Sequence, residues 1–235
     1  DTPAVNGGQT CAQFFVGLKS LVSDIYPMNS EKQFVNTLED IITDRGAPNR
    51  LVSDSAQVET SKRVKAILRA LFIGEWQSTP HRQHQNPAER HIQVIKDLAN
   101  VLLDRTGAAL ELWLEALKYT CFLLNHTFNE AIGEIPVNKL LGSTTDISVL
   151  LRFHWFQEVY YKMDDNGFPS DSRELKGNIV GIAEHVGHAL TYRVYNPETR
   201  KILNRGDLRA VDPKSSNKRL DLLRGEDFDN PSKNS

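Results

Sequence analysis

The spacing of the apolar residues changes partway along the chain, and this change constrains the fold more than any other feature. Two short apolar runs within residues 11–28 read as a β-hairpin, and segments with alternating strand and helix periodicity follow up to about residue 142. This order is typical of a mixed sheet with helices on its faces. We therefore expect an α/β fold with antiparallel opening strands, and with the strands at 11–16, 21–27 and 50–54 in one sheet.

The helices of this first part are marked by their end residues. Ser30 is a suitable N-cap for a helix that ends at Gly46, and Ser61 is a suitable N-cap for the next one. A long amphipathic helix runs from Glu89 to Gly107. The segment "LELWLEALKYTCFLLNHT" predicts one more helix, which is apolar enough to be largely buried.

The second half of the chain has a different pattern. Residues 150–211 hold short β-rich runs separated by Gly, Asn and Pro, which predict a small all-β unit, either a curved sheet or a barrel. Beyond Pro213 the chain is polar and is predicted to be disordered. The expected parts are an α/β core over 1–142, a β-rich domain over 143–212 and a tail over 213–235.

Composition sets broad limits on the class of protein. Hydrophobic residues make up 40% and charged residues 25% of the chain, as in an ordinary globular protein, and the net charge of −2 does not by itself indicate a nucleic-acid partner. Cys11 and Cys121 lie far apart in apolar stretches, which favours reduced, buried thiols. No apolar run has the length of a membrane span and no signal peptide is recognisable, so we expect an intracellular protein.

Three carboxylates stand where one end of the sheet is expected. Asp54 ends a short strand, Asp1 precedes it by 53 positions, and Glu89 follows it by 35 positions in the first turn of the long helix. Clusters of Asp and Glu oxygens suit Mg²⁺ or Mn²⁺, and two such ions can support displacement at phosphorus. The simpler interpretation of Glu89 is that its carboxylate stabilises the positive end of the helix dipole.

The sequence around these carboxylates resembles the integrase region of copia-type LTR retrotransposon polyproteins, which belong to the retroviral-integrase superfamily. The segments "GQTCAQFFVG", "DRGAPNRLVSDSAQ", "HQNPAERHIQVIK" and "FLLNHT" follow the order of that family's catalytic core. The later segments "VYYK", "GNIVGIAEHVGHALTYRV" and "ILNRGDLRAV" resemble the β-rich region behind the core. The resemblance covers about residues 1–212.

The resemblance implies a fold, an activity and a set of site residues. It implies an RNase H-like core that processes 3′ ends and transfers strands of retrotransposon DNA into target DNA, in the nucleus and as a homo-oligomer. Asp1, Asp54 and Glu89 would be the catalytic residues and would hold two Mg²⁺ or Mn²⁺ ions. The residues assigned to DNA binding are Lys96, Gln93, Arg82 and Asn86.

Alternative interpretations remain open. Asp24 could replace Asp1 as the first carboxylate, although an exposed strand residue is the simpler interpretation. Trp76 and Trp113 are predicted to lie in the core rather than to stack on bases. An integrase-like remnant without activity, which binds nucleic acid or partners, is the second candidate for function. The near-neutral charge favours the remnant, because phosphate contacts dominate affinity for DNA.

Overall fold

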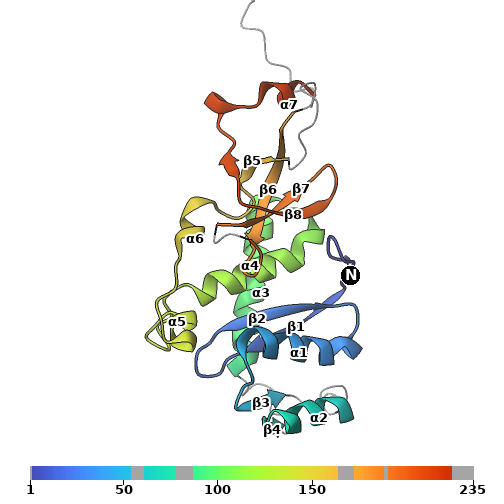
Figure 1. The fold of residues 1–235 in the computed structure, drawn as a ribbon, viewed down its shortest axis with the longest axis vertical. Helices are drawn as coiled ribbons and strands as arrows, with labels where there is room; N and C mark the ends of the chain where they lie inside the picture. The colour runs from blue at the N-terminus through green and yellow to red at the C-terminus, as the bar shows by residue number, and fades with distance from the viewer. Residues whose placement is uncertain (1, 54–60, 78–86, 164–171, 188–189, 224–235) are drawn as a thin grey trace, which may run out of the picture. The chain divides into compact units, whose positions relative to one another are not determined.

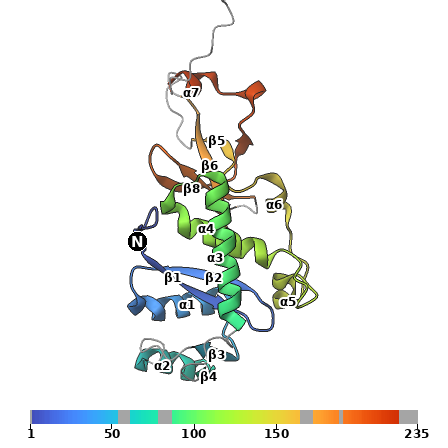
Figure 2. The ribbon, with the colours of Figure 1, turned by 180° about the vertical axis from the view of Figure 1, so that it is seen from behind.

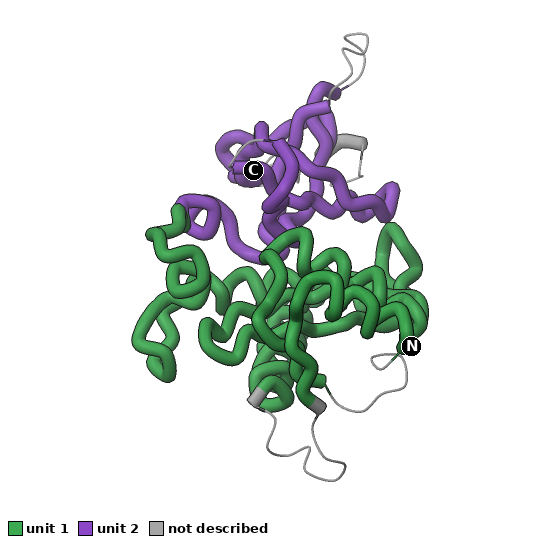
Figure 3. Tube along the Cα trace, turned by 60° about the horizontal axis from the view of Figure 1, so that its bottom comes forward, with its two compact units in different colours: residues 1–147 green, residues 148–235 purple. Residues whose placement is uncertain are grey.

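The structure is a computed structural model that describes residues 2–53, 61–77, 87–163, 172–187 and 190–223. Its contacts divide the chain into two compact units, Asp1–Ile147 and Ser148–Ser235 (Figure 3). Asp1, Asp54, Arg82 and Asn86 lie outside the described residues.

The described residues of unit 1 form two pairs of strands (Figure 1). β1 (Cys11–Val16) and β2 (Ser23–Met28) form an antiparallel hairpin, whereas β3 (Arg50–Ser53) and β4 (Gly74–Gln77) are parallel. The predicted α/β class, with both strand orientations, is confirmed. The predicted single sheet is wrong for the described strands, because the two pairs are separate two-stranded sheets.

Side chains, rather than main-chain hydrogen bonds, connect the two pairs. Phe15 of β1 and Leu51 of β3 both pack against one cluster, whose buried members include Phe34 and Leu38. Strand pairing needs the backbones about 4.8 Å apart. Helix α1 (Phe34–Arg45) supplies the apolar surface against which both pairs pack.

The helix boundaries agree with most of the predicted end signals. The Ser61 hydroxyl accepts a hydrogen bond from the Val64 N–H at 3.4 Å and caps α2, as predicted. Ser30 makes no side-chain capping bond, and a 3-10 turn (Glu31–Gln33) precedes α1. Gly107, at a φ of 64°, ends the long helix as predicted. The remaining helices of unit 1 are α2 (Lys62–Ala70), α3 (Pro87–Thr106), α4 (Trp113–Asn125) and α5 (Pro136–Leu141), with a 3-10 turn at Leu110–Leu112.

The hairpin is covered on both faces. Phe15 points to the α1 side, whereas Ala12 and Phe14 pack against a second cluster that contains Ile95 of α3 and Leu114 of α4. Successive strand residues point to opposite faces, so β1 contributes to two cores at once. Figure 2 shows α3 running across the hairpin on this second side. This packing holds α3, and with it Glu89, against the sheet.

Unit 2 is built on one antiparallel sheet, as the β-rich pattern predicts. Its strand order is β8-β7-β6-β5-β9, and the register shifts between Ile179 and Gly181 of β6. Fully buried Val159, Val180 and Val194 lie at its centre. The elements are α6 (Ser148–Arg152), β5 (Glu158–Lys162), β6 (Glu174–Ile182), β7 (Tyr192–Asn196), β8 (Lys201–Arg205) and β9 (Leu208–Ala210).

The beginning of the predicted tail is ordered, which corrects the sequence-based expectation. A 3-10 turn (Pro213–Ser215) and a short helix, α7 (Lys218–Leu223), follow the last strand. The backbone N–H of Asn217 donates to the Tyr160 hydroxyl at 3.0 Å, and Leu220 is buried. The polar composition of this segment alone predicts disorder. A few specific contacts with the sheet order it instead. Residues 224–235 lie outside the described residues.

Two further expectations can be compared with the described residues. Cys121 and Cys11 are both free thiols, as predicted. Cys121 is buried as predicted, whereas Cys11 is only partly buried. Among the helices of the described ranges, none combines the length and the apolar character needed to cross a membrane.

Candidate active site

Glu89 is the one member of the predicted carboxylate triad that lies within the described residues. It stands in the first turn of α3, and its side chain is exposed. It forms no ion pair or side-chain hydrogen bond with another described residue. Among the residues that the structure describes, its carboxylate therefore has no partner. How close it comes to Asp1 and Asp54 stays a prediction.

Gln93 and Lys96 lie on the same side of α3 as Glu89. Their positions, four and seven residues further on, put them on one helical face, and both are exposed. Ile95 and Ala99 lie on a different side of the helix, which is buried. The Gln93 amide donates to Asp97 Oδ1 at 2.8 Å, whereas Lys96 forms no ion pair with the described residues. The expected common face therefore exists, and its role in DNA binding stays a prediction.

A buried polar network fixes α3 against the hairpin. His91 Nε2 lies 2.6 Å from Ser23 Oγ, which joins α3 to β2. Asn125, at the end of α4, accepts from the Ser23 N–H at 2.8 Å and donates to the Ser23 carbonyl at 2.9 Å. Ser23 is fully buried. Because His91 is two residues from Glu89, this network sets the position of the helix start that carries the carboxylate.

The sequence analysis missed this network. Its signals are a histidine on the border of the apolar face of α3 and a lone asparagine at the end of an otherwise apolar helix, at His91 and Asn125. Neither signal identifies Ser23 as the hydrogen-bond partner, because Ser23 and Asn125 are 102 residues apart in the sequence.

The pair of Ser23 and His91 is not a hydrolytic dyad. Ser23 has no exposed surface, so a substrate cannot reach its hydroxyl, which also bonds the Leu21 carbonyl at 3.3 Å. Burial lowers the pKa of His91 and so favours the neutral imidazole. The pair therefore serves to join α3 to the hairpin.

Asp24 is bound in an ion pair, which argues against it as the first metal ligand. Arg45 approaches it with two nitrogens, Nε at 3.0 Å from Oδ2 and Nη2 at 2.7 Å from Oδ1. The Asp24 side chain is only 16% exposed, so it is also not the exposed strand residue expected from the sequence. A cation would have to compete with a bidentate guanidinium.

The environment of Trp76 also differs from the prediction. Trp76 on β4 is 51% exposed and does not lie in the core, because the outer face of the two-stranded β3–β4 sheet has no buried layer among the described residues. Trp113 does pack against the α3–α4 cluster as predicted, and its indole N–H donates to the Thr2 carbonyl at 3.0 Å.

The donor chemistry at Glu89 fits a hard divalent cation. Within the described ranges, no group of three or more His, Cys, Asp or Glu side chains could hold a metal ion. Glu89 offers an unpaired carboxylate, which is the ligand type that Mg²⁺ and Mn²⁺ prefer. A metal site would thus need Glu89 together with carboxylates from outside these ranges, as the triad of the sequence analysis requires.

The chain is similar to solved structures at low sequence identity. No protein-family model matches the sequence, and no curated protein matches it. The chain is similar to the HTLV-2 integrase catalytic core domain in complex with magnesium (TM-score 0.47, 16% identity, 55% of this chain and 82% of that one). It is also similar to the catalytic core domain of BIV integrase (TM-score 0.47, 18% identity, 60% and 91%).

A longer match is to a chain of the simian T-cell lymphotropic virus intasome in complex with PP2A regulatory subunit B56 gamma (TM-score 0.46, 14% identity, 85% of this chain and 74% of that one). Chains this distant in sequence share at most a fold. The activity of this protein has to be argued from its own residues.

Proposed function

We propose that the protein is the catalytic core, with its following β-rich unit, of a metal-dependent DNA integrase of a copia-type retrotransposon. Its reaction is the attack of water or a DNA 3′-hydroxyl on a phosphodiester, which processes a DNA end and then joins it to target DNA. The support comes from the ordered set of sequence segments that resemble this family, and from the α/β architecture that carries them.

The observation that carries the proposal is the state of Glu89. A carboxylate that served only the helix dipole could pair with any neighbouring cation, yet Glu89 is exposed and unpaired among the described residues. The buried network two residues further on holds the start of α3 in place. A fixed position and a free carboxylate are what a metal ligand requires.

The residues have distinct proposed roles. Asp1, Asp54 and Glu89 would hold two divalent ions, which when bound activate the attacking oxygen and stabilise the leaving one. Lys96, seven residues after Glu89 on α3, would neutralise a DNA phosphate. Gln93 would form a hydrogen bond to the DNA backbone from the same helical face. Arg82 and Asn86, ahead of the helix, would make further DNA contacts.

We further propose the substrates, the oligomeric state and the cellular site of action. The substrates are retrotransposon DNA ends and target DNA, and the active form is a homo-oligomer within a larger polyprotein product. Its site of action is the nucleus, where target DNA lies.

The test is a joining reaction that compares two glutamates of similar exposure. The chain is incubated with a labelled DNA duplex, a plasmid target and Mn²⁺, and covalent joining is measured on a denaturing gel. Glu89→Gln should lower joining by about 100-fold or more, the usual cost of losing one group that stabilises a transition state. Glu31→Gln, which changes an exposed glutamate in another first helical turn, should leave joining unchanged.

Manganese binding, followed by calorimetry, gives a second readout. Glu89→Gln should weaken binding and Glu31→Gln should not. Equal joining by the two variants would leave only the dipole role for Glu89. A chain that neither joins DNA nor binds Mn²⁺ would reject the enzyme.

A further inference from the structure

Unit 2 contains a cavity to which the integrase proposal assigns no role. Its volume is about 680 Å³, which is within the range of ligand-binding pockets, and residues at β5, β6, β9 and the segment that carries α7 line it. We call it the unit 2 pocket. Its charged lining consists of four cations and two carboxylates, namely Lys162, Arg173, Arg209, Arg219, Glu174 and Asp207. We propose that the unit 2 pocket binds an acidic peptide segment of a partner protein.

The register of the sheet places the charged side chains of the pocket on one face. Lys162 of β5 lies opposite Glu174 of β6, and Tyr160 of β5 lies opposite Arg209 of β9. Side chains two residues apart in a strand point to the same face, so these four residues share it. Lys162 Nζ lies 3.7 Å from Asp207 Oδ2, which brings Asp207 to the same place. The sheet thus gathers charges that are distant in the sequence into one site.

One part of the lining is already satisfied by internal hydrogen bonds. Glu174 accepts two hydrogen bonds from Arg209, at 2.6 and 2.7 Å, and one from Asn217 at 3.0 Å. Arg209 also donates to the Ser215 carbonyl, and its guanidinium lies 4.1 Å from the centroid of the Tyr160 ring. These groups hold the α7 segment against the sheet. They shape the pocket and are not free to bind a ligand.

Two other cations of the lining can bind a ligand. Arg173 is exposed and forms no ion pair or side-chain hydrogen bond with the described residues. Lys162 pairs with Asp207 at 3.7 Å, and the two side chains are 64% and 80% exposed. An ion pair this exposed contributes little to stability, so a ligand can displace it at small cost. An anion would therefore gain two cations without breaking the hydrogen bonds around Glu174.

The charge of the lining favours an anionic ligand. Cations outnumber carboxylates by four to two in the lining, although the whole chain has a net charge of −2. Both carboxylates have cationic partners within the pocket, Glu174 in Arg209 and Asp207 in Lys162. The pocket is therefore a local positive site, and the guanidinium of Arg173 can hold a carboxylate through two parallel hydrogen bonds.

The mixture of donors and acceptors favours a peptide over a phosphate polymer. An acidic peptide brings carboxylates for Arg173 and Lys162, and its main-chain N–H groups can donate to the exposed carboxylate of Asp207. A nucleic-acid backbone brings phosphates, which accept hydrogen bonds and repel Asp207. The site is thus complementary to aspartate and glutamate side chains on a polypeptide. It is separate from the DNA contacts proposed on α3.

The test is the affinity for a fluorescent peptide of alternating aspartate and glycine, measured by anisotropy without metal. Arg173→Glu should weaken binding by about tenfold, the loss of roughly one charge-assisted hydrogen bond. The thermal midpoint of this variant should equal that of the parent, because Arg173 has no partner among the described residues. The same peptide with asparagine in place of aspartate should bind the parent more weakly.

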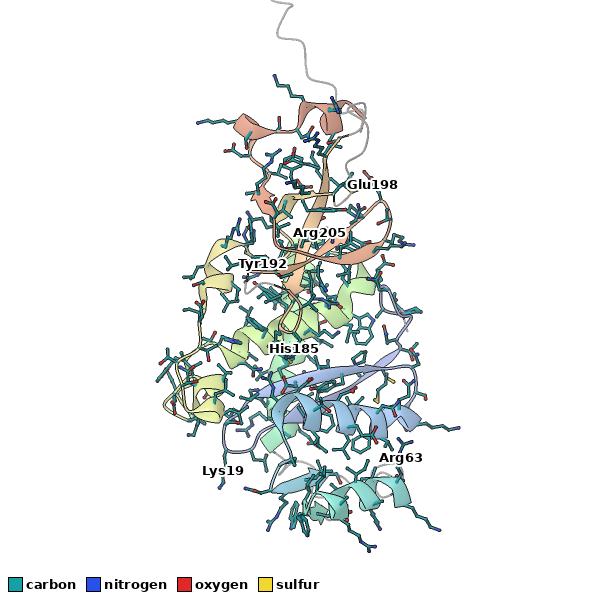
Figure 4. All side chains as sticks on the ribbon, in the orientation of Figure 1. Lys19, Arg63, His185, Tyr192, Glu198 and Arg205 are labelled. Carbon is teal, nitrogen blue, oxygen red and sulfur yellow. The ribbon has the colours of Figure 1, made fainter. Side chains whose placement is uncertain are left out.

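Lys201→Glu is the matched control. Lys201 is exposed and begins β8, which stands at the opposite end of the strand order from β9 (Figure 4 labels Arg205 of the same strand). This variant changes the net charge of the chain as Arg173→Glu does, but at a place outside the pocket. It should bind the aspartate peptide like the parent.

Three outcomes would overturn the proposal. The first is unchanged affinity for the aspartate peptide in Arg173→Glu, and the second is equal affinity of the parent for the asparagine peptide. The third concerns a labelled oligothymidylate, which Arg173→Glu should bind like the parent. A loss of oligothymidylate affinity as large as the loss for the peptide would assign the pocket to nucleic acid. Glu89→Gln should bind the peptide like the parent, so failure here is separate from failure of the integrase proposal.

A last variant examines an acidic run of the chain itself. The segment "GEDFD" at 225–229 follows α7 in the sequence and lies outside the described residues. Replacing its three acids by the corresponding amides should leave the affinity for the added peptide unchanged. A higher affinity in this variant would mean that the run itself competes for the pocket, and would overturn the assignment to a partner protein.

Discussion

At the scale of single residues, we expect His91 to make the stability of the protein sensitive to mild acid. Burial lowers its pKa, so the unfolded chain takes up a proton more readily than the folded chain does. The contribution of neutral His91 to stability is complete above the ordinary histidine pKa of about 6.5. It is lost as the pH falls from that value towards the lowered pKa of His91 in the folded protein. The thermal midpoint of the parent should therefore fall between pH 7.5 and 5.5, and that of His91→Asn should fall less.

The control for this prediction is His154→Asn. His154 is exposed, and its substitution should leave the pH dependence of the midpoint as in the parent. Identical pH dependence in His91→Asn and the parent would mean that protonation of His91 does not affect folding.

Single residues also show which parts of a site can be predicted from sequence. The common face of Glu89, Gln93 and Lys96 follows from the helical repeat alone, and it is confirmed. The sequence predicts a core position for Trp76 because an aromatic residue in a strand is usually covered, but coverage depends on what packs over a sheet. The sequence around Trp76 does not contain that information.

At the scale of secondary-structure elements, Asn125 connects α4 to β2. Its amide satisfies both main-chain groups of a fully buried residue, Ser23. Asn125→Ala should therefore destabilise the protein by about 2–4 kcal/mol, since a buried N–H and a buried carbonyl would each lose a partner. Asn129→Ala removes one exposed hydrogen bond to the Ala131 N–H and should cost less than about 1 kcal/mol. Urea denaturation measures both, and equal costs would contradict the role of Asn125.

The elements themselves were largely predictable, whereas their assembly was not. The hairpin, the long helix and the Ser61 cap depend on local patterns, and each appears near its expected place. The joining of the two strand pairs into one sheet is a long-range property, and local periodicity does not determine which strands become neighbours.

At the scale of the whole molecule, the two compact units should respond separately to mutation. In unit 2, Arg209 binds Glu174 through two hydrogen bonds at 2.6 and 2.7 Å, and Asn217 donates to Glu174 Oε2 at 3.0 Å. The pKa of Glu174 lies below its ordinary value, mainly because of the hydrogen bond from Arg209. Its contribution to stability is thus present above about pH 4.5 and is lost as the pH falls through the lowered pKa.

Glu174→Gln should therefore destabilise unit 2 at pH 7, by about 1 kcal/mol for a partly exposed pair, and by less at pH 3. Hydrogen exchange read by mass spectrometry can locate the effect. Peptides from Ser148–Leu223 should exchange faster in the variant at pH 7, and those from unit 1 should not change. Faster exchange throughout the chain would show that the two units unfold together.

The side-chain amide of Asn125 also affects how readily the protein can aggregate. The Ser23 N–H and carbonyl point away from β1, towards the outer edge of β2, and such an unpaired edge can add a strand from another molecule. Because Asn125 occupies both groups, an incoming strand finds neither a donor nor an acceptor at this position. A helix side chain thus protects the start of this edge against intermolecular pairing, and the protection lasts only while α4 stays docked.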